Sequence, residues 1–197
     1  HEPQMYTELK KEIVSAEEAL TKALSIIEKG SVIASGGSAT LGEVGLLDYI
    51  KNHSEDYTFI DRSIAKTEDE KRQIHAKAIL SDYYLMSTNA FTIDGQLVNI
   101  DGNGNRVSAL CYGPKHVVII TGMNKLVPSV DAAYKRIRQD ACPPNCVRLG
   151  LTNPCSKTGI CGECMSASSI CDLFVTTRMS RYPDRIHVIM VGEELGY

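Results

Sequence analysis

The chain has 197 residues, a formal net charge of −3 at pH 7, and 43% hydrophobic and 23% charged residues. This composition excludes disordered and collagen-like chains, and no run of about 20 apolar residues offers a membrane span. The excess of acidic over basic residues argues against a positively charged surface for nucleic acid, and the lack of Trp argues against a surface that stacks on bases. We therefore expect one domain over residues 1–197, without nucleic acid or membrane partners.

Signals for helices and strands alternate along the chain. A capping residue followed three positions later by Glu marks three helix starts. In chain order we expect a helix from Ser15 to Gly30, a strand at 32–34, a helix from Thr40 to Ile50, a strand at 57–60, a helix from Thr67 to Leu80, strands at 83–87 and 116–121, a helix from Ser129, and strands at 173–177 and 186–191. Several of these strands are apolar throughout, which is typical of a parallel sheet covered on both faces.

Residues 89–106 depart from this alternation. Asp94-Gly95 and Asp101-Gly102 separate short segments at 91–93, 96–100 and 107–110, which indicates antiparallel hairpins. The predicted fold class is therefore α/β, with a mostly parallel sheet and an antiparallel hairpin insertion.

Six of the seven cysteines lie within residues 142–171. Four of them follow the spacing Cys155-x5-Cys161-x2-Cys164-x6-Cys171. The first gap is one residue longer than in the C-x4-C-x2-C spacing of plant-type iron–sulfur proteins. Structural zinc sites usually pair two C-x2-C knuckles, and only one is present here. The pattern favours an iron–sulfur cluster, with 4Fe-4S as the expected form and zinc as the alternative.

The other three cysteines have less defined roles. Cys142 and Cys146 could replace one of the four ligands, act as redox partners, or be buried as small apolar residues. Cys111 stands alone in an apolar strand and is expected in the core. The odd cysteine count and the lack of a visible secretory signal favour reduced thiols and a cytoplasmic location.

A glycine-rich turn follows the strand at 32–34. A helix starting there would present free N–H groups to an anion, and glycine would permit its close approach. The candidate ligand-binding residues are Gly36, Gly37, Ser38, Thr40 and Glu43. The alternative is a tight turn in which Thr40 and Glu43 form a capping box.

Residues 99–106 carry more polar side chains than a turn requires. Their amide, carboxylate and guanidinium groups suit a ligand bearing a carboxylate or phosphate. The candidate residues are Asn99, Asp101, Asn103, Gly104, Asn105 and Arg106. A hairpin turn in which Asn and Asp bond the local backbone is the alternative. No catalytic residue can be assigned from the sequence, and the histidines show no metal-type spacing.

Several segments carry the same family resemblance. They are Ser35-Gly36-Gly37-Ser38, Ser87-Thr88-Asn89-Ala90, residues 99–106, Gly113-Pro114-Lys115, Gly122-Met123-Asn124-Lys125, the Pro154-Cys155 stretch through Cys161, and the tail at 185–196. Together they resemble the LUD domain, a lactate-utilisation family, over nearly the whole chain. The resemblance is closest to the stand-alone, cysteine-bearing branch of that family.

This resemblance implies a three-layer Rossmann-like fold of the NagB/RpiA/CoA-transferase class, in which ligands bind at loops after strand ends. It also implies a part in the oxidation of L-lactate. Members of the branch share Cys155, Cys161, Cys164 and Cys171. Neither Cys142 nor Cys146 belongs to that shared pattern.

Three functions follow as hypotheses. The first is an iron–sulfur protein of lactate or 2-hydroxy-acid metabolism that transfers electrons or acts as an accessory subunit. The second is an enzyme whose cluster or pocket acts on a small hydroxy acid or on a phosphate- or CoA-type ligand. The third is a zinc-stapled regulatory module that binds a metabolite. The expected partners are a small anionic metabolite, a redox partner protein and a second copy in a homodimer.

Overall fold

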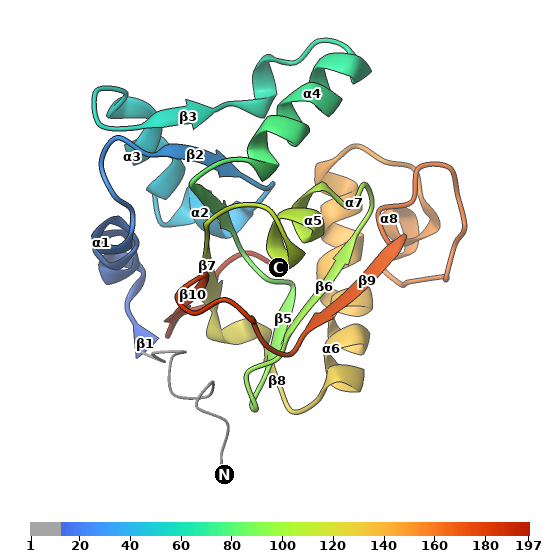
Figure 1. Cartoon of the computed structure of the whole chain (residues 1–197). Coiled ribbons are helices and arrows are strands. Elements are labelled where there is room, and N and C mark those ends of the chain that lie inside the picture. The colour runs from blue at the N-terminus through green and yellow to red at the C-terminus, as the bar shows by residue number, and fades with distance from the viewer. Residues whose placement is uncertain (1–12) are drawn as a thin grey trace. The chain divides into compact units, whose positions relative to one another are not determined.

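A computed structural model describes residues 13–197 of the chain (Figure 1). These residues divide into two compact units. The first contains 13–87, 108–123 and 180–196, and the second contains 88–107, 124–179 and 197. The single domain expected over 1–197 stays a prediction, and its residues 1–12 lie outside the described part.

The first unit is built on a parallel sheet. Its six strands lie in the order β1 (Ile13–Val14), β10 (Ile186–Val191), β7 (His116–Gly122), β4 (Tyr83–Met86), β2 (Val32–Ser35) and β3 (Thr58–Ile60). Every neighbouring pair is parallel. The α/β class with a parallel sheet is therefore confirmed, although the short β1 was not expected from the sequence.

The central strand β7 explains why the strand signals lack alternation. Successive side chains of a strand point to opposite faces of its sheet. Val117, Val118, Ile119 and Ile120 are nonetheless all fully buried, so both faces of this strand are covered. A strand buried on both faces has no polar side and reads as a continuous apolar run.

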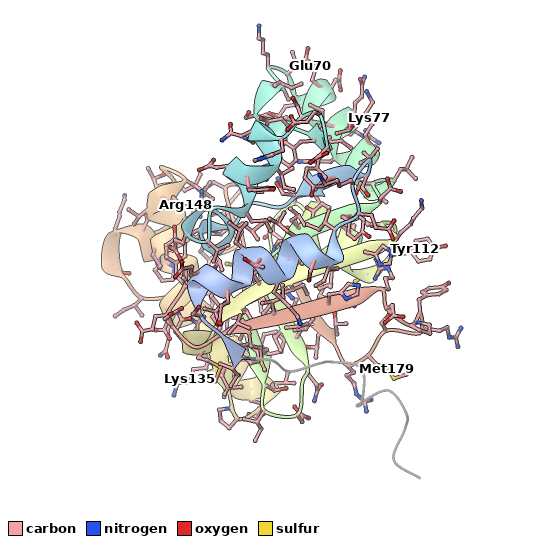
Figure 2. All side chains as sticks on the ribbon, turned by 90° about the vertical axis from the view of Figure 1, so that its left-hand side faces the viewer. Glu70, Lys77, Tyr112, Lys135, Arg148 and Met179 are labelled. Carbon is pink, nitrogen blue, oxygen red and sulfur yellow. The ribbon has the colours of Figure 1, made fainter. Side chains whose placement is uncertain are left out.

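Four helices of the first unit precede β7 in the sequence: α1 (Ala16–Ile26), α2 (Ala39–Glu43), α3 (Leu46–Asn52) and α4 (Glu68–Ile79). The capping boxes predicted for α1 and α4 are confirmed, with Ser15 paired to Glu18 and Thr67 paired to Glu70. The polar side chains of α4 project outward, as Glu70 and Lys77 show (Figure 2). Its mixed charge therefore marks a solvated helix face.

The single helix expected from Thr40 to Ile50 is wrong. The chain forms α2 and α3 instead, broken at Gly45, whose φ of 71° lies in the left-handed region that glycine tolerates. The predicted capping box is also wrong, because the N-cap of α2 lies two residues earlier than the expected Thr40. Ser38 is its N-cap and accepts a hydrogen bond from Leu41 N.

The second unit contains a four-stranded sheet in the order β8 (Leu126–Val127), β5 (Ala90–Thr92), β6 (Leu97–Asp101) and β9 (Leu173–Thr177). Strands β5 and β6 form the antiparallel hairpin that was predicted, and β9 runs beside β6 (Figure 1). The turn between β5 and β6 contains Gly95, which has a φ of 86°. The hairpin insertion is thus confirmed.

The segment 107–110 was predicted as an extended part of these hairpins and is helical instead. It belongs to α5 (Asn105–Cys111). A short apolar run does not distinguish a buried strand from one buried helix turn. Arg185 is buried and donates hydrogen bonds to the carbonyls of Ala109 and Leu110, each at 2.7 Å, which satisfies acceptors at the helix end.

The remaining helices of the second unit are α6 (Val130–Arg136), α7 (Cys142–Arg148) and α8 (Pro154–Thr158). Ser129 caps α6 as expected. Ala133 and Ile137 pack with Ala90, Val98 and Ile100 of the hairpin in one buried cluster. Within residues 13–197, no helix combines the length and apolar character needed to cross a bilayer.

Candidate functional site

The cysteine region begins where α6 passes into α7. The chain winds through a π-helical turn at Ile137–Ala141, and α7 then accepts Pro143 and Pro144 because the N–H groups of a first turn need no helical partner. Cys142 and Cys146 lie four positions apart and therefore share a helix face. This face is turned inward, since only 7% of Cys142 and 1% of Cys146 are exposed.

Four further cysteines follow α7. Cys155 is buried in the short helix α8, which ends where Gly159 adopts a left-handed φ of 71°. The chain then enters a loop at 159–172 that carries Cys161, Cys164 and Cys171, each partly exposed. The structure thus places the four predicted ligands on one helix and the loop that directly follows it.

Asn153 holds this loop in place. Its side-chain amide donates to Ser168 O at 2.9 Å, and its side-chain oxygen accepts from Ser166 Oγ at 3.0 Å and Ser168 Oγ at 2.6 Å. The amide also lies 3.6 Å from the sulfur of Cys146. Sequence reasoning missed this residue. Its signal is an Asn placed directly before Pro154, where a helix starts, and two residues before the first predicted ligand, Cys155.

The segment leading into Cys171 passes close to the end of β6. A Cβ atom on Gly102 would lie 2.9 Å from Ile170 Cα, so only glycine leaves room for this backbone. Asp172 N donates to Asp101 O at 3.1 Å directly after the cysteine. The backbone on either side of Cys171 is therefore anchored to the hairpin.

The thiols meet in pairs that sequence spacing does not reveal. The sulfurs of Cys142 and Cys171 lie 3.4 Å apart, and those of Cys146 and Cys155 lie 3.6 Å apart. Each pair joins one predicted ligand to one cysteine outside the four-residue pattern. We call these two contacts the thiol pairs.

The thiol pairs shift the acidity of their members. Hydrogen bonding to Cys142 lowers the pKa of Cys171, whereas the same contact, together with burial, raises the pKa of Cys142. Burial, and to a smaller extent the hydrogen bond to Cys146, raises the pKa of Cys155 to about 11.

The six cysteines at 142–171 are named here the cysteine group, and the two thiol pairs are the sulfur–sulfur contacts found within it. Across residues 13–197, no three or more His, Cys, Asp or Glu side chains are arranged so that they could hold a metal ion. The donor set itself fits iron–sulfur chemistry, because thiolate is the ligand such clusters prefer.

Cys111 differs from the expectation that it lies in the core. It is exposed at the last position of α5, next to Tyr112, whose ring projects outward (Figure 2). The prediction is wrong because it assumed a buried strand, whereas a helix turns this position outward.

Arg106 lies at the centre of the predicted polar loop. Its guanidinium donates to the side-chain oxygens of Asn99 at 2.5 Å and Asn89 at 2.8 Å, and to Ile100 O at 2.8 Å. It also forms an ion pair with Asp101 at 3.2 Å, and the two side chains are only 12% and 8% exposed. These contacts stabilise the hairpin. The predicted binding of a carboxylate or phosphate by Arg106 is not tested by them and stays a prediction.

The other residues of this loop take different positions. Asp101 accepts a hydrogen bond from Gly104 N at 2.8 Å, and Gly104 has a φ of 80°. Asn103 is exposed and Asn105 is partly buried at the start of α5. Among the described residues, the Asn99 amide nitrogen is a buried donor that has no acceptor.

The glycine-rich turn at residues 36–43 lies in the first unit. The polar loop at 99–106 and the cysteine group lie in the second. Gly36 N donates to Leu85 O at 3.0 Å. A Cβ on Gly37 would lie 2.7 Å from the guanidinium of Arg62, a cation that sequence reasoning did not connect with this turn. Its proximity is compatible with the predicted anion site, which stays a prediction.

Thr40 and Glu43 contact the tail of the chain. Thr40 is buried and its hydroxyl donates to Leu195 O at 3.4 Å, while the Glu43 carboxylate accepts from Gly196 N at 2.8 Å. Both side chains thus tie the turn to residues near the C-terminus. Their contribution to ligand binding, like the expected homodimer, is not tested by these contacts.

Comparison with protein families gives one match over most of the chain. A family described as "LUD domain" matches residues 11–191. Among curated proteins, no sequence match was found.

Solved structures also resemble the chain. A DUF162 family protein from Deinococcus radiodurans superposes with a TM-score of 0.52 at 16% identity, covering 95% of this chain and 90% of that one. This likeness supports the same overall fold. A ribose 5-phosphate isomerase A from Methanocaldococcus jannaschii (TM-score 0.37, 14% identity) covers 68% of this chain and 66% of its own. The δ subunit of eIF2B from Chaetomium thermophilum (TM-score 0.38, 12% identity) covers 59% and 50%.

Proposed function

Because the chain belongs to the LUD-domain family of lactate-utilisation-related proteins, we propose that it binds an iron–sulfur cluster and transfers electrons in 2-hydroxy-acid metabolism. The observation that carries this proposal is the cysteine group. Helices α7 and α8 and the loop at 159–172 carry its six thiols within thirty residues, and two pairs of these thiols are in direct contact. A collection of thiols of this density suits soft metal ions and clusters.

The four cysteines predicted as ligands from their spacing would hold the cluster. Cys155 supplies a ligand from a helix, and Cys161, Cys164 and Cys171 supply three from the loop at 159–172. When bound, such a cluster accepts and releases single electrons. Asn153 and the Gly102 contact hold the ligand segments, so the chain itself sets the loop path.

The surface of the loop supports exchange with a protein partner. Ile160 and Met165 flank the Cys161–Cys164 knuckle and are 72% and 97% exposed. Met is one of the residues enriched where proteins bind one another. An electron carrier needs its ligands near such a surface, which the partly exposed Cys161 and Cys164 satisfy.

The proposal is tested on full-length protein purified without oxygen. Wild type should be brown, with broad visible absorption and about four irons and four sulfides per chain. Cys161→Ser should lose most of this iron, whereas the matched substitution Cys111→Ser, at an exposed thiol outside the cysteine group, should retain it. A colourless wild-type protein that contains zinc, or no metal, would overturn the proposal.

A further inference from the structure

Cys142 and Cys146 form part of the cysteine group but are not needed for a four-ligand cluster. They lie one helical turn apart on α7, and each touches one of the proposed ligands. A buried cysteine often serves only as a small apolar residue. Here, however, each sulfur faces a second sulfur, which gives it a chemistry that packing alone does not require.

The contact distances separate these two cysteines from the cluster ligands. In a four-iron cluster each cysteine binds its own iron, so the ligand sulfurs are held apart by the cluster. The sulfurs of Cys142 and Cys171 are instead in contact at 3.4 Å. Cys142 is therefore poorly placed to act as a fellow ligand of Cys171, and well placed to react with it.

We propose that Cys142 and Cys171 form a disulfide when the cluster is absent, which withdraws Cys171 from the ligand set. A disulfide requires a sulfur–sulfur distance of about 2.05 Å, so the two sulfurs must approach by about 1.4 Å. The backbone beside Cys171 is anchored through Asp172 and Gly102. Rotation of the two side chains therefore supplies most of this approach.

The oxidant is a low-molecular-weight disulfide, RSSR, such as oxidised glutathione. The Cys171 sulfur attacks one sulfur of RSSR, which breaks the R–S–S–R bond, forms a mixed disulfide and releases one RSH. The Cys142 sulfur then attacks the Cys171 sulfur, forms the protein disulfide and releases the second RSH. Two electrons pass from the cysteine sulfurs to the reagent, and the two thiol protons leave with the released thiols.

Burial distinguishes this pair from the other thiol pair. Cys171 is partly exposed, so a small reagent can reach it. Cys146 and Cys155 are 1% and 7% exposed, and the amide of Asn153 also lies against the Cys146 sulfur. We therefore assign the first oxidation to Cys142 and Cys171, and a slower reaction to the buried pair.

The first arm of the test uses metal-free, fully reduced full-length chain. It is treated with oxidised glutathione, free thiols are alkylated, and tryptic peptides are mapped by mass spectrometry. Wild type should show peptide 139–148 linked to peptide 158–178. The link should persist in Cys146→Ala, which leaves Cys142 as the thiol of peptide 139–148, and be lost in Cys142→Ala. A disulfide confined to peptide 158–178 would join two of Cys161, Cys164 and Cys171 without Cys142 and overturn the inference.

The second arm measures the consequence, which rests on the proposed function. Oxidised wild type should fail to take up iron and sulfide until a dithiol reductant is added. Cys142→Ala lacks the thiol that resolves the mixed disulfide, so after treatment it should carry glutathione on peptide 158–178 in place of the link and should also load only after reduction. Equal uptake by oxidised and reduced wild type would overturn the withdrawal of Cys171. If reduced wild type takes up no cluster, the proposed function fails while the disulfide result of the first arm stands on its own.

Discussion

The sheet of the first unit and the cysteine region of the second are stabilised by different interactions. In the sheet, strands such as β7 are buried on both faces, and capping boxes fix the helices α1 and α4. The loop at 159–172 is held by the Asn153 amide, an exposed Arg138–Glu163 ion pair and sulfur contacts. Apolar burial therefore fixes the sheet, whereas the loop at 159–172 depends on polar and sulfur contacts.

The largest loss of stability is expected from a substitution in the buried sheet of the first unit. Leu85 lies in β4 and is fully buried. Leu85→Ala should lower the free energy of unfolding by about 3 kcal/mol, through lost apolar burial and the cavity that remains. Denaturant unfolding of the full chain measures it, with Leu80→Ala, at an 84% exposed position, as the control. Equal effects of the two substitutions would contradict the burial described for β4.

A smaller and more local effect is expected at Asn153. Asn153→Ala removes its hydrogen bonds to Ser166 and Ser168, a local loss of about 1–3 kcal/mol. Amide hydrogen exchange in residues 159–172 should then accelerate by about tenfold or more, with a smaller change in global unfolding. The matched control is Asn145→Ala, because this amide contacts only the exposed Arg148 side chain in the hydrogen bonds found for it. Unchanged exchange in the loop would refute the anchoring role of Asn153.

The same contrast explains how much of the fold could be predicted from the sequence. The sheet and the capped helices leave local signals, such as the apolar run of β7 and the Thr67–Glu70 capping box, and these were identified correctly. Errors arose where local signals are ambiguous. The run at 107–110 fits a strand or a helix turn, and only the contacts of Arg185 show which is formed. At Gly45 the backbone conformation, rather than residue preference, divides one expected helix into two.

The candidate site was predictable only in part, for a related reason. Spacing reveals the four cysteines at 155–171, because loop ligands are close in sequence. It does not reveal that Cys142 touches Cys171, since that contact depends on how α7 packs against a loop 29 positions away. At Arg106 the polar neighbours suggested a ligand site, and the structure shows that Asn89, Asn99 and Asp101 contact its guanidinium. Packing of these side chains cannot be inferred from spacing, and the ligand site itself stays a prediction.

The smallest expected effect returns to the first unit and depends on pH. Burial, together with the nearby His116, lowers the pKa of His187 below its ordinary value of 6.5, although the Asp184 carbonyl opposes this. The unfolded chain then binds more protons than the folded chain between the folded pKa and 6.5, so stability should fall as pH drops below about 6.5. Urea unfolding of metal-free wild type and His187→Gln at pH 7.5 and 5.5 measures this difference. The wild type should lose more stability over this interval, although less than Leu85→Ala costs, and the curves should run parallel between pH 7.5 and 8.5. Equal losses in the two chains would show that His187 does not resist protonation in the fold.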